Sequence, residues 1–489
     1  MPSARASASQ PPVYDVIVVG AGPGGSTAAN LLARQGVSTL LLDKSEFPRD
    51  KVCGDGLTPQ AIHWLDRLGC VDEVLAETRG CIKDCDLYIN GVHRLTAPFP
   101  SGSIYPDFAV LLDRRRFDNI LLQSAIAKGA HFEPGTSVRG IETDADGIRV
   151  QAVHQGKPVE HRGHMVIGAD GVHSVVSRAI GNSLKSGARA MSLRAYYRDV
   201  QCPGSQVKVY FDREYFPGYG WAFVDDDGFA NIGLGYAYDG RFPLQSGLSQ
   251  TFETFLAKDL EPMLRRATRC GKVAGGLVAF YRPKRVVADR VMLIGDAANH
   301  ADPLNGGGIH KAIEGAFYAS EVALQALEAG AFTAQSLGIY EQRWKTEAEQ
   351  DWLTGELFLA IAKNPSLKEL CLHLLTQIAA MSQADPRFQT FCSGVFSGVV
   401  SQASILSPKV LFEAFPMDPD IWLTYLQSQG GIAVGSIRAG GGALLGLARA
   451  GLGALRDPLA NALWGVEVAS KAVNLAGRQI SGVLANAGE

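Results

Sequence analysis

One stretch near the start of the chain, residues 14–44, constrains the fold more than any other. It opens with an unbroken β-branched run, Val16–Val19, which is typical of a strand buried on both faces of a parallel sheet. Gly20, Gly22 and Gly25 then form the pattern G-x-G-x-x-G. In such a pattern the first glycine permits a tight turn, the second lets the backbone approach a pyrophosphate, and the third lets a helix pack close to the strand.

The residues that follow complete a βαβ unit. The pattern predicts a helix over 26–35 that stops at Gly36, and then a second buried strand over 37–42. Asp43 ends this strand, where an acidic side chain can bond ribose hydroxyls, and Lys44 comes next. Strand, glycines, helix, second strand and carboxylate in this order predict a dinucleotide site. A purely structural turn, with Asp43 as an ordinary strand-end residue, is the alternative.

Composition bounds the class of protein. The chain has 489 residues, too many for one ordinary hydrophobic core, so two or three domains are expected. A hydrophobic fraction of 46% and a charged fraction of 19% indicate a folded protein that is soluble or peripheral to a membrane. The 46 basic and 49 acidic residues nearly cancel, so no nucleic-acid partner is expected.

Cysteine usage and the N-terminus bear on location. The eight cysteines form no tandem CxxC pattern, and the lone pair Cys81 and Cys85 supplies too few ligands for zinc, so we predict no metal site and mostly reduced thiols. Residues 1–12 are rich in Ser, Ala and Pro without an apolar core, which indicates a disordered leader rather than a signal peptide. No uncharged apolar run reaches the length of a transmembrane helix. We predict a cytoplasmic protein and leave a peripheral membrane location open.

Turn and cap residues place the next elements. Thr58 and Pro59 are typical of the N-cap and first residue of a helix, and Asn90-Gly91 predicts a type I′ hairpin between strands over 84–89 and 92–97. Periodicity predicts, in order, a helix over 113–128, strands near 131–142, 147–154, 165–167 and 290–294, and a helix over 309–329.

Between residues 192 and 236 the pattern changes to successive short strands, which predicts an antiparallel sheet inserted into the first domain. The predicted fold class is α/β: a Rossmann-like dinucleotide-binding domain with an inserted antiparallel β-sheet substrate domain and a C-terminal helical region. We expect the cofactor domain to comprise 13–82, 107–190 and 284–345, the substrate domain 83–106 and 191–283, and the helical region 346–429.

The last stretch, residues 430–489, is rich in Gly, Ala and Leu, with basic residues spaced among them. Glycine at this density weakens isolated helices. One interpretation is an amphipathic surface that lies on a membrane or packs on a partner. The other, which the sequence favours, is a loosely packed helical appendage or a flexible tail.

Two later stretches strengthen the cofactor hypothesis. The first is Gly168-Ala169-Asp170-Gly171, and the second runs from Gly295-Asp296 to Gly307-Gly308. Both place a strand-end Asp beside glycine, where the backbone can approach a ligand. The helix that opens at Ile309 has free N–H groups, and its positive end suits the electron-rich N1/C2=O edge of a reduced flavin.

These stretches, in this order, resemble the para-hydroxybenzoate hydroxylase-like FAD superfamily over residues 13–345. The resemblance implies a Rossmann-like FAD-binding domain with FAD as the cofactor. It also implies that Asp43 binds the adenosine ribose and that Asp296 binds a ribityl hydroxyl. Three further residues would lie near the adenine or the pyrophosphate: Val138 through its backbone, Arg114, and Asp170. The alternative for Arg114 is a solvated member of a basic cluster with the two arginines that follow it.

Two further motifs resemble the geranylgeranyl reductase family within this superfamily. The loop Pro48–Leu57 is similar to that family's P-x-x-K-x-C-G loop, and Tyr219–Val224 is similar to its Y-x-W-x-F-P motif. The second departs from the motif at Val224, where the family has proline, and this leaves the floor of the pocket and the substrate open. The resemblance implies a reductase of carbon–carbon double bonds in an isoprenoid lipid or a prenylated quinone.

The chemistry fits these residues. An isolated alkene is reduced by hydride, here from flavin N5, and by a proton, so the site must hold the alkene in place and supply the proton. A prenyl chain has almost nothing to hydrogen-bond, so its pocket should be apolar and aromatic. Tyr219, Trp221 and Phe223, with Tyr215 and Phe216 nearby, are the candidate substrate contacts. Ordinary packing within the sheet is the alternative for each.

The resemblance places the Cys53–Gly54 loop against the isoalloxazine ring of the flavin. We take Cys53 as the candidate catalytic residue, because a thiol there could position the flavin or deliver a proton. Its alternative is a small buried hydrophobe. Lys51 could act on the thiol or pair with a phosphate, whereas His300 and His310 are expected to be structural.

Several functional alternatives remain. Reduction needs a donor, either NAD(P)H that docks transiently or a ferredoxin-like protein, because the sequence contains no second G-x-G-x-x-G unit. The first alternative function is an FAD-dependent monooxygenase or halogenase, although the halogenase pattern W-x-W-x-I-P is absent. The second is a scaffold or membrane-docked sensor that uses residues 430–489. The oligomeric state is not predicted.

Overall fold

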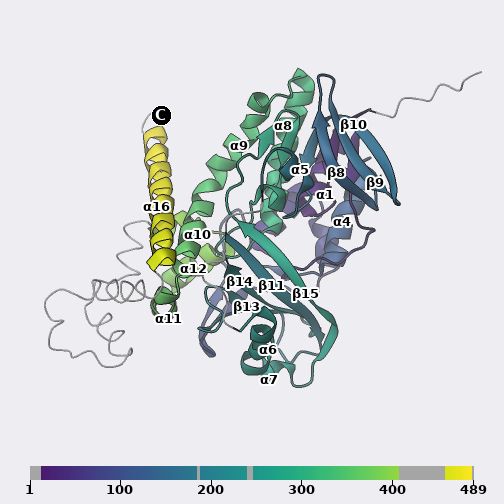
Figure 1. Ribbon diagram of the computed structural model, residues 1–489. Helices are drawn as coiled ribbons and strands as arrows, with labels where there is room; N and C mark the ends of the chain where they lie inside the picture. Colours follow the sequence, from purple (N-terminus) through teal and green to yellow (C-terminus); the bar gives the residue numbers. More distant parts are fainter. Residues whose placement is uncertain (1–12, 184–187, 239–245, 407–457, 487–489) are drawn as a thin grey trace, which may run out of the picture.

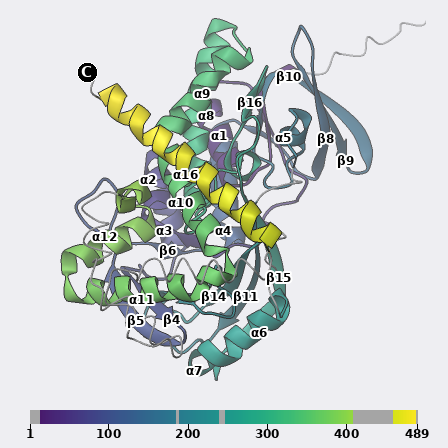
Figure 2. The same cartoon turned by 60° about the vertical axis from the view of Figure 1, so that its left-hand side comes forward.

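The computed structural model describes residues 13–183, 188–238, 246–406 and 458–486 (Figure 1). The expected leader over 1–12 lies outside the described residues, as does the stretch 407–457, which includes the first half of the expected tail. The two larger of its three β-sheets occupy opposite halves of the described molecule, and helices pack on both; the third sheet is the strand pair β3 and β6. Figure 2 shows the last helix crossing the C-terminal helices on one side.

The first sheet has a parallel centre. Its path is β16-β17-β10-β1-β2-β7, in which β17, β10, β1, β2 and β7 run parallel. Residues 16–19 of β1 are at most 4% exposed, which confirms the strand predicted to be buried on both faces. The eight strands are β1 (Val13–Val19), β2 (Thr39–Leu42), β7 (His131–Glu133), β8 (Thr136–Thr143), β9 (Ile148–His154), β10 (Lys157–Gly168), β16 (Val287–Ala288) and β17 (Val291–Leu293).

The helix after the glycines begins earlier than predicted. α1 spans Pro23–Ala33, because Pro23 is suited to the first helical position and Gly22 serves as the N-cap. Gly36 adopts a left-handed φ of 78°, which reverses the chain after the helix end. α1 packs beside α4 (Arg114–Ala127) and α8 (Ile309–Ala329), and these helices cover one face of the parallel sheet.

The strand predicted over 165–167 is much longer. β10 covers twelve residues because its first half forms an antiparallel hairpin with β9, while its last residues run parallel to β1. Only the last part of β10 is buried on both faces. The continuous apolar run by which the strand was predicted therefore covers only that part.

The second sheet is mainly antiparallel, as predicted. Its order is β15-β11-β14-β13-β12-β4-β5, with one parallel pair, β12 and β4. The hairpin of β4 and β5 is confirmed, with Asn90 and Gly91 both at positive φ. Its strands are β4 (Asp84–Ile89), β5 (Val92–Pro98), β11 (Ala188–Arg198), β12 (Gln206–Phe211), β13 (Tyr219–Val224), β14 (Ala230–Tyr238) and β15 (Thr268–Phe280).

The predicted α/β fold class is confirmed, whereas the domain boundaries stay a prediction. The cap at Thr58, whose hydroxyl accepts from the Ala61 amide, and the helix over 309–329 are confirmed as well. The remaining described elements are β3 (Gly56–Leu57), β6 (Val110–Leu111), α2 (Pro59–Leu68), α3 (Val71–Ala76), α5 (Val175–Ala179), α6 (Leu248–Asp259), α7 (Glu261–Leu264), η1 (Gly295–Ala298), α9 (Ala334–Glu347), α10 (Glu349–Ala362), η2 (Pro365–Leu367), α11 (Lys368–Ala384), α12 (Pro386–Ser397), η3 (Gln402–Leu406) and α16 (Pro458–Asn486).

Candidate functional site

The turn after β1 uses its glycines in two ways. A Cβ on Gly20 would lie 2.4 Å from the carbonyl oxygen of Ala169, and one on Gly25 would lie 1.7 Å from that of Gly20. These two glycines therefore allow close packing, and they bring the turn against the GADG stretch. At Gly22 the nearest heavy atom is Nη2 of Arg49, at 3.6 Å. The backbone at Gly22 is therefore uncovered and faces the Arg49 guanidinium, which leaves room for a pyrophosphate to approach.

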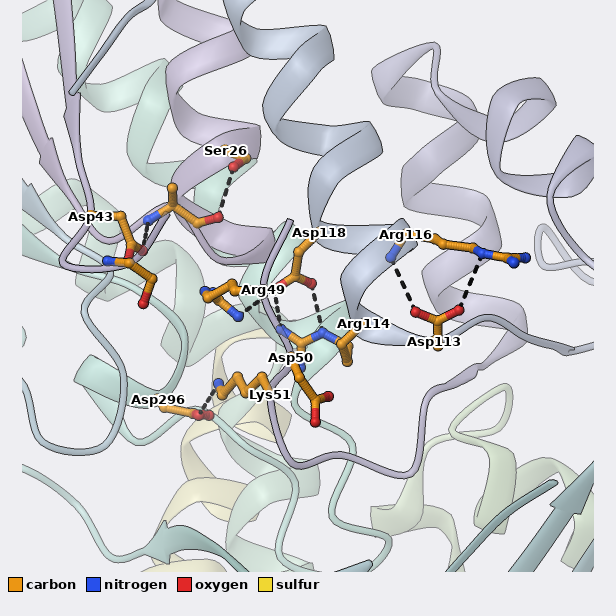
Figure 3. Close-up of polar contacts among 12 residues, drawn as sticks. Ser26, Asp43, Arg49, Asp50, Lys51, Asp113, Arg114, Arg116, Asp118 and Asp296 are labelled. Atoms are coloured by element: carbon orange, nitrogen blue, oxygen red, sulfur yellow. Dashed lines mark hydrogen bonds and ion pairs between the residues drawn. The ribbon is translucent and has the colours of Figure 1, made fainter. Parts of the chain in front are cut away.

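Positive charge converges on this opening. α1 begins here, so the positive end of its dipole points into it. Arg49 lies beside it and pairs with Asp118 at 3.1 Å (Figure 3). Sequence reasoning missed Arg49, because no local pattern shows that the loop after β2 folds back over the glycines. The arrangement fits a diphosphate.

Arg114 lies deeper than Arg49. It is 2% exposed, and its Nε and Nη2 donate to the two carboxylate oxygens of Asp118 at 2.6 and 2.7 Å. The solvated cluster therefore comprises only Arg115 and Arg116, which are exposed. Because Asp118 pairs with both the buried Arg114 and the partly exposed Arg49, Arg114 orients the carboxylate that holds Arg49 (Figure 3). Direct contact of Arg114 with a pyrophosphate stays a prediction.

Asp43 closes on the glycine-rich turn. Its Oδ2 accepts from the Ala21 amide and its Oδ1 from the Ser45 amide, both at 2.8 Å. The strand-end carboxylate is thereby fixed beside the turn, while Lys44 is exposed. Val138 lies on β8, which contacts β2. The assignments of Asp43 to ribose and of Val138 to adenine stay predictions.

Asp170 caps a short helix. Its Oδ2 accepts from the Val175 amide at 2.6 Å, and its Oδ1 accepts from the Ser174 hydroxyl at 2.5 Å. Burial raises the pKa of Asp170, and these donors partly offset that shift. The carboxylate therefore fixes the shape of the GADG turn, which packs on Gly20. If Asp170 supports a pyrophosphate, it would do so indirectly, by holding this turn in place.

The GDAA stretch and the start of α8 lie together at the carboxyl end of β17. A Cβ on Gly308 would lie 3.5 Å from Oδ1 of Asp296, and Ile309 is the first residue of α8. Lys51 Nζ lies 3.4 Å from Oδ2 of Asp296 (Figure 3). The structure therefore brings the cysteine loop to the predicted ribityl-binding carboxylate.

The aromatic strand reaches the same place. The Tyr219 hydroxyl donates to the carbonyl oxygen of Asn305 at 2.7 Å, and the Asn305 side chain accepts from the Gly307 amide at 2.8 Å. Gly307 tolerates no side chain, because a Cβ would lie 2.5 Å from the His310 ring. β13 and the N-terminus of α8 are thereby joined.

Tyr219, Trp221 and Phe223 share one face of β13, with ring centroids 6.0 and 6.4 Å apart along the series. The Trp221 indole lies over Gly233 of the neighbouring strand, where a Cβ would come within 2.1 Å of it. The missing side chain there lets the indole lie flat against β14, and this role of Gly233 was missed from the sequence.

Of the two nearby aromatic residues, Tyr215 is not a pocket residue. It is 2% exposed and packs against Phe255 of α6, on the opposite face of the sheet. Phe216 lies in a small core with Ile89 and Leu372. The prediction that Tyr215 lines the pocket was wrong, because a turn between β12 and β13 takes it out of the alternation of β13.

The cysteine loop lies across the aromatic face. Phe223 packs on Gly54, where a Cβ would lie 3.0 Å from the ring. The carbonyl oxygen of Cys53 accepts from the Asn231 amide at 2.8 Å, and Arg194 pairs with Asp50 at 2.8 Å. The predicted site residues of the loop, of β13 and of the GDAA stretch therefore come together, with Cys53 between them.

Asp55 is a further residue that sequence reasoning missed. Its carboxyl group is fully buried and accepts from Tyr196 and Asn231. Burial raises its pKa to about 7, although these hydrogen bonds and the charges of Arg194 and Arg114 act in the opposite direction. The only signal in the sequence is its place two residues after Cys53.

The two histidines near the GDAA stretch are core residues, as expected. His300 and His310 are each 2% exposed. His300 stacks on Trp344 with centroids 4.2 Å apart, and burial lowers its pKa to about 3. A neutral, stacked imidazole supports packing rather than proton transfer at neutral pH.

Comparison with known proteins places this site in a family. Residues 13–214 match the model of the FAD binding domain. A digeranylgeranylglycerophospholipid reductase of Methanothermobacter thermautotrophicus is 30% identical over 418 residues, which cover 82% of this chain and 97% of that protein. The chain belongs to the geranylgeranyl reductase family of FAD-dependent oxidoreductases.

Two further comparisons agree with this assignment. The menaquinone reductase of Mycolicibacterium smegmatis is 31% identical over 355 residues, 70% of this chain and 81% of that protein. The crystal structure of a geranylgeranyl bacteriochlorophyll reductase-like protein from Thermoplasma acidophilum superposes with a TM-score of 0.66 at 24% identity, covering 84% of this chain and 99% of that one. This member of the family is therefore an FAD-dependent reductase with the fold predicted.

Proposed function

We propose that this reductase saturates carbon–carbon double bonds of an isoprenoid chain, carried by a geranylgeranyl lipid or by menaquinone. The observation that carries the proposal is the position of the Cys53 loop. Lys51 ties the loop to Asp296 on one side, and Gly54 packs on Phe223 on the other. The arrangement sets an aromatic wall and a thiol beside the predicted flavin-binding residues, which suits a substrate that offers almost no hydrogen-bonding groups.

The residues present fit FAD. Gly22, the N-terminus of α1 and Arg49 would hold its diphosphate, with Asp43 on the ribose. Asp296 and the N-terminus of α8 would hold the ribityl chain and the electron-rich edge of the ring system. When bound and reduced, FAD supplies the hydride.

The other parts of the reaction fall to the chain's own residues. Tyr219, Trp221 and Phe223 would orient the prenyl chain and exclude water, because hydride transfer to an alkene requires a fixed approach. The thiol of Cys53 would hold the proton destined for the second carbon. The oxygenase or halogenase alternative has less support, since the relatives that align over most of their length are named reductases.

We assign the reducing equivalents to an external donor, NAD(P)H or a ferredoxin-like protein. The sequence contains no second G-x-G-x-x-G unit for a nicotinamide nucleotide, so NAD(P)H would dock only transiently. Stopped-flow mixing separates the two donors. If NAD(P)H is the donor, NADPH or NADH alone should bleach the flavin absorbance. If a ferredoxin-like protein is the donor, only reduced ferredoxin should bleach it.

We further propose that α16 rests on a lipid surface. The three charged side chains of the helix, Glu467, Lys471 and Arg478, face the body of the protein, where they pair with Lys363, Glu356 and Glu349 respectively.

The opposite side of α16 is apolar and exposed. Leu463, Val466 and Val473 are 52%, 70% and 70% exposed. None of the described helices combines the length and apolarity of a membrane span. An outward apolar face on a charge-paired helix suits the surface of a membrane that dissolves the substrate.

Flotation with liposomes tests this contact. The triple variant Leu463→Glu, Val466→Glu, Val473→Glu should lose binding, whereas Ile339→Glu, which alters an exposed apolar side chain of α9, should retain it. Equal binding of both variants would refute the role of α16. The lipid contact would then lie on another surface of the protein.

The reductase proposal is tested by a single turnover without oxygen. Reduced protein is mixed with a geranylgeranyl lipid or menaquinone, and we expect the flavin to reoxidise while the lipid gains two hydrogen atoms for each double bond. An oxygen requirement with an oxygenated or halogenated product would favour the alternative.

A further inference from the structure

Asp55 occupies a constrained position in the cysteine loop. Its φ is 61°, in the left-handed region that residues with a side chain adopt uncommonly, although Asp enters it more readily than most. The carboxyl group is 0% exposed. Its backbone carbonyl also accepts from the Leu112 amide at 3.2 Å. Backbone and side chain are therefore both held, and this points to a role for the carboxyl group in setting the path of the loop.

The partners of this carboxyl group come from the second sheet. Tyr196 of β11 donates its hydroxyl to Oδ2 at 2.6 Å, and Asn231 of β14 donates its amide to the same oxygen at 2.8 Å. The Asn231 amide also donates to the carbonyl oxygen of Cys53 at 2.8 Å. One buried amide thus binds the backbone of Cys53 and the side chain of Asp55 at the same time.

The amide is itself oriented by the aromatic strand. The Trp221 indole N–H donates to Oδ1 of Asn231 at 2.9 Å, and Asn231 is 0% exposed. Since its oxygen accepts and its nitrogen donates, the network fixes which way the amide faces. A continuous set of hydrogen bonds therefore connects the predicted substrate wall, through Trp221 and Asn231, to Cys53.

The electrostatic balance at Asp55 depends on its protonation. Its Oδ1 atom is buried and has no hydrogen-bond partner. The charged groups that face Asp55 are Arg194 and Arg114, and Arg194 also lies 3.9 Å from the centre of the Tyr196 ring. Burial nevertheless outweighs both cations. An ionised Asp55 would place an unpartnered anionic oxygen in the interior, which is costly.

We propose that Asp55 and Asn231 are positioning residues that latch Cys53 against the aromatic strand, and that the neutral form of the Asp55 carboxyl group keeps the latch closed. Ionisation of Asp55 favours opening of the loop, because opening hydrates the carboxylate. The inference rests on the proposed function only for the role of Cys53, since the latch itself is a property of the folded chain. For the enzyme, opening of the latch in alkaline solution means that Cys53 is no longer held against the aromatic strand.

Hydrogen exchange of the FAD-loaded protein tests the latch without any substrate. The measured quantity is the exchange rate of a peptide covering residues 49–57, corrected for the intrinsic pH dependence of amide exchange. Between pH 6 and 8.5 the corrected rate of the wild type should rise about tenfold, as expected when a carboxyl group with a pKa of about 7 in the closed state opens into water. Asp55→Asn, which keeps the shape and cannot ionise, should show no such rise.

Two further variants complete the experiment. Asn231→Ala should raise the corrected rate at pH 6 by up to about tenfold, the effect of losing a buried hydrogen bond. Asp259→Asn is the matched control, because burial raises the pKa of Asp259 to about 6, yet this residue lies on α6 away from the loop. It should exchange as the wild type does at every pH.

The latch would be overturned if the wild type and Asp55→Asn shared one pH-independent rate. If Asn231→Ala does not fold, the pH comparison of Asp55→Asn with the wild type still decides the question. Failure of the reductase assay with normal exchange behaviour would refute the proposed function and leave the latch standing.

Discussion

Lys51 and Asp296, separated by 245 positions in the sequence, meet at 3.4 Å and tie the cysteine loop to the carboxyl end of β17. Both side chains are partly exposed, at 44% and 19%. Such a pair contributes at most about 1 kcal/mol to global stability. Its value lies in bringing the loop that carries Cys53 to the predicted ribityl-binding carboxylate.

Replacing Lys51 should therefore affect catalysis more than folding. In Lys51→Met we expect an unchanged melting temperature and turnover lowered about tenfold or more, because the loop loses its tie to Asp296. Lys345→Met is the control, since Lys345 is similarly exposed and pairs with Glu341 on α9. Unchanged turnover in Lys51→Met would show that the tie is dispensable.

The three glycines of the first turn should separate folding from cofactor binding. Gly22→Ala has space for the new Cβ in the protein itself, so the variant should fold and bind FAD at least tenfold more weakly. Gly25→Ala would place its Cβ 1.7 Å from a carbonyl oxygen and should be strongly destabilised. Titration with FAD and thermal unfolding measure the two effects. Tight FAD binding by Gly22→Ala would place the diphosphate elsewhere.

Cys53→Ala should keep FAD and lose most of its turnover. The thiol belongs to the loop between the aromatic face and Asp296. Its removal leaves intact the hydrogen bond from Asn231 to the backbone of residue 53. We expect turnover to fall at least about a hundredfold, the lower end of the range for a lost proton donor. Cys202→Ala, at another half-buried thiol, is the control. Wild-type turnover in Cys53→Ala would assign the thiol to packing.

Asp55 should make stability depend on pH. Its pKa is about 7 in the folded chain and about 4 when unfolded, so between these values the folded state binds more protons. The free energy of unfolding must then fall as pH rises through this window, by at most about 1.4 kcal/mol per pH unit. Asp55→Asn lacks this loss, so its stability relative to the wild type should increase from pH 4 to 7 and then level off. A constant difference across this range would show that Asp55 ionises normally.

Local patterns predicted the elements whose signals are local. Gly20, Gly22 and Gly25, the cap at Thr58 and the turn at Asn90-Gly91 act within a few residues, and the structure has the elements that they predict. The path of β15 was missed, because its central glycines weaken the alternation by which strands are recognised.

The site depends on contacts that no local pattern encodes. Arg49 reaches Gly22 only because the loop folds back, and Asn231 meets Asp55 only because β14 passes under the loop. α16 shows the same limit: its charged residues face inward because α10 supplies their partners, and a helix considered alone gives no sign of this. Tertiary pairing over long distances in sequence decides these features.

The central claim is tested most directly by the half-reaction of the reduced protein without oxygen. Protein reduced by dithionite is mixed with a geranylgeranyl lipid and, separately, with menaquinone, and flavin absorbance and product mass are followed together. We predict that the absorbance of oxidised flavin returns with one of these lipids and that the product carries two more hydrogen atoms per reduced double bond. A flavin that stays reduced with both lipids, and reoxidises only when air yields an oxygenated or halogenated product, would contradict the claim.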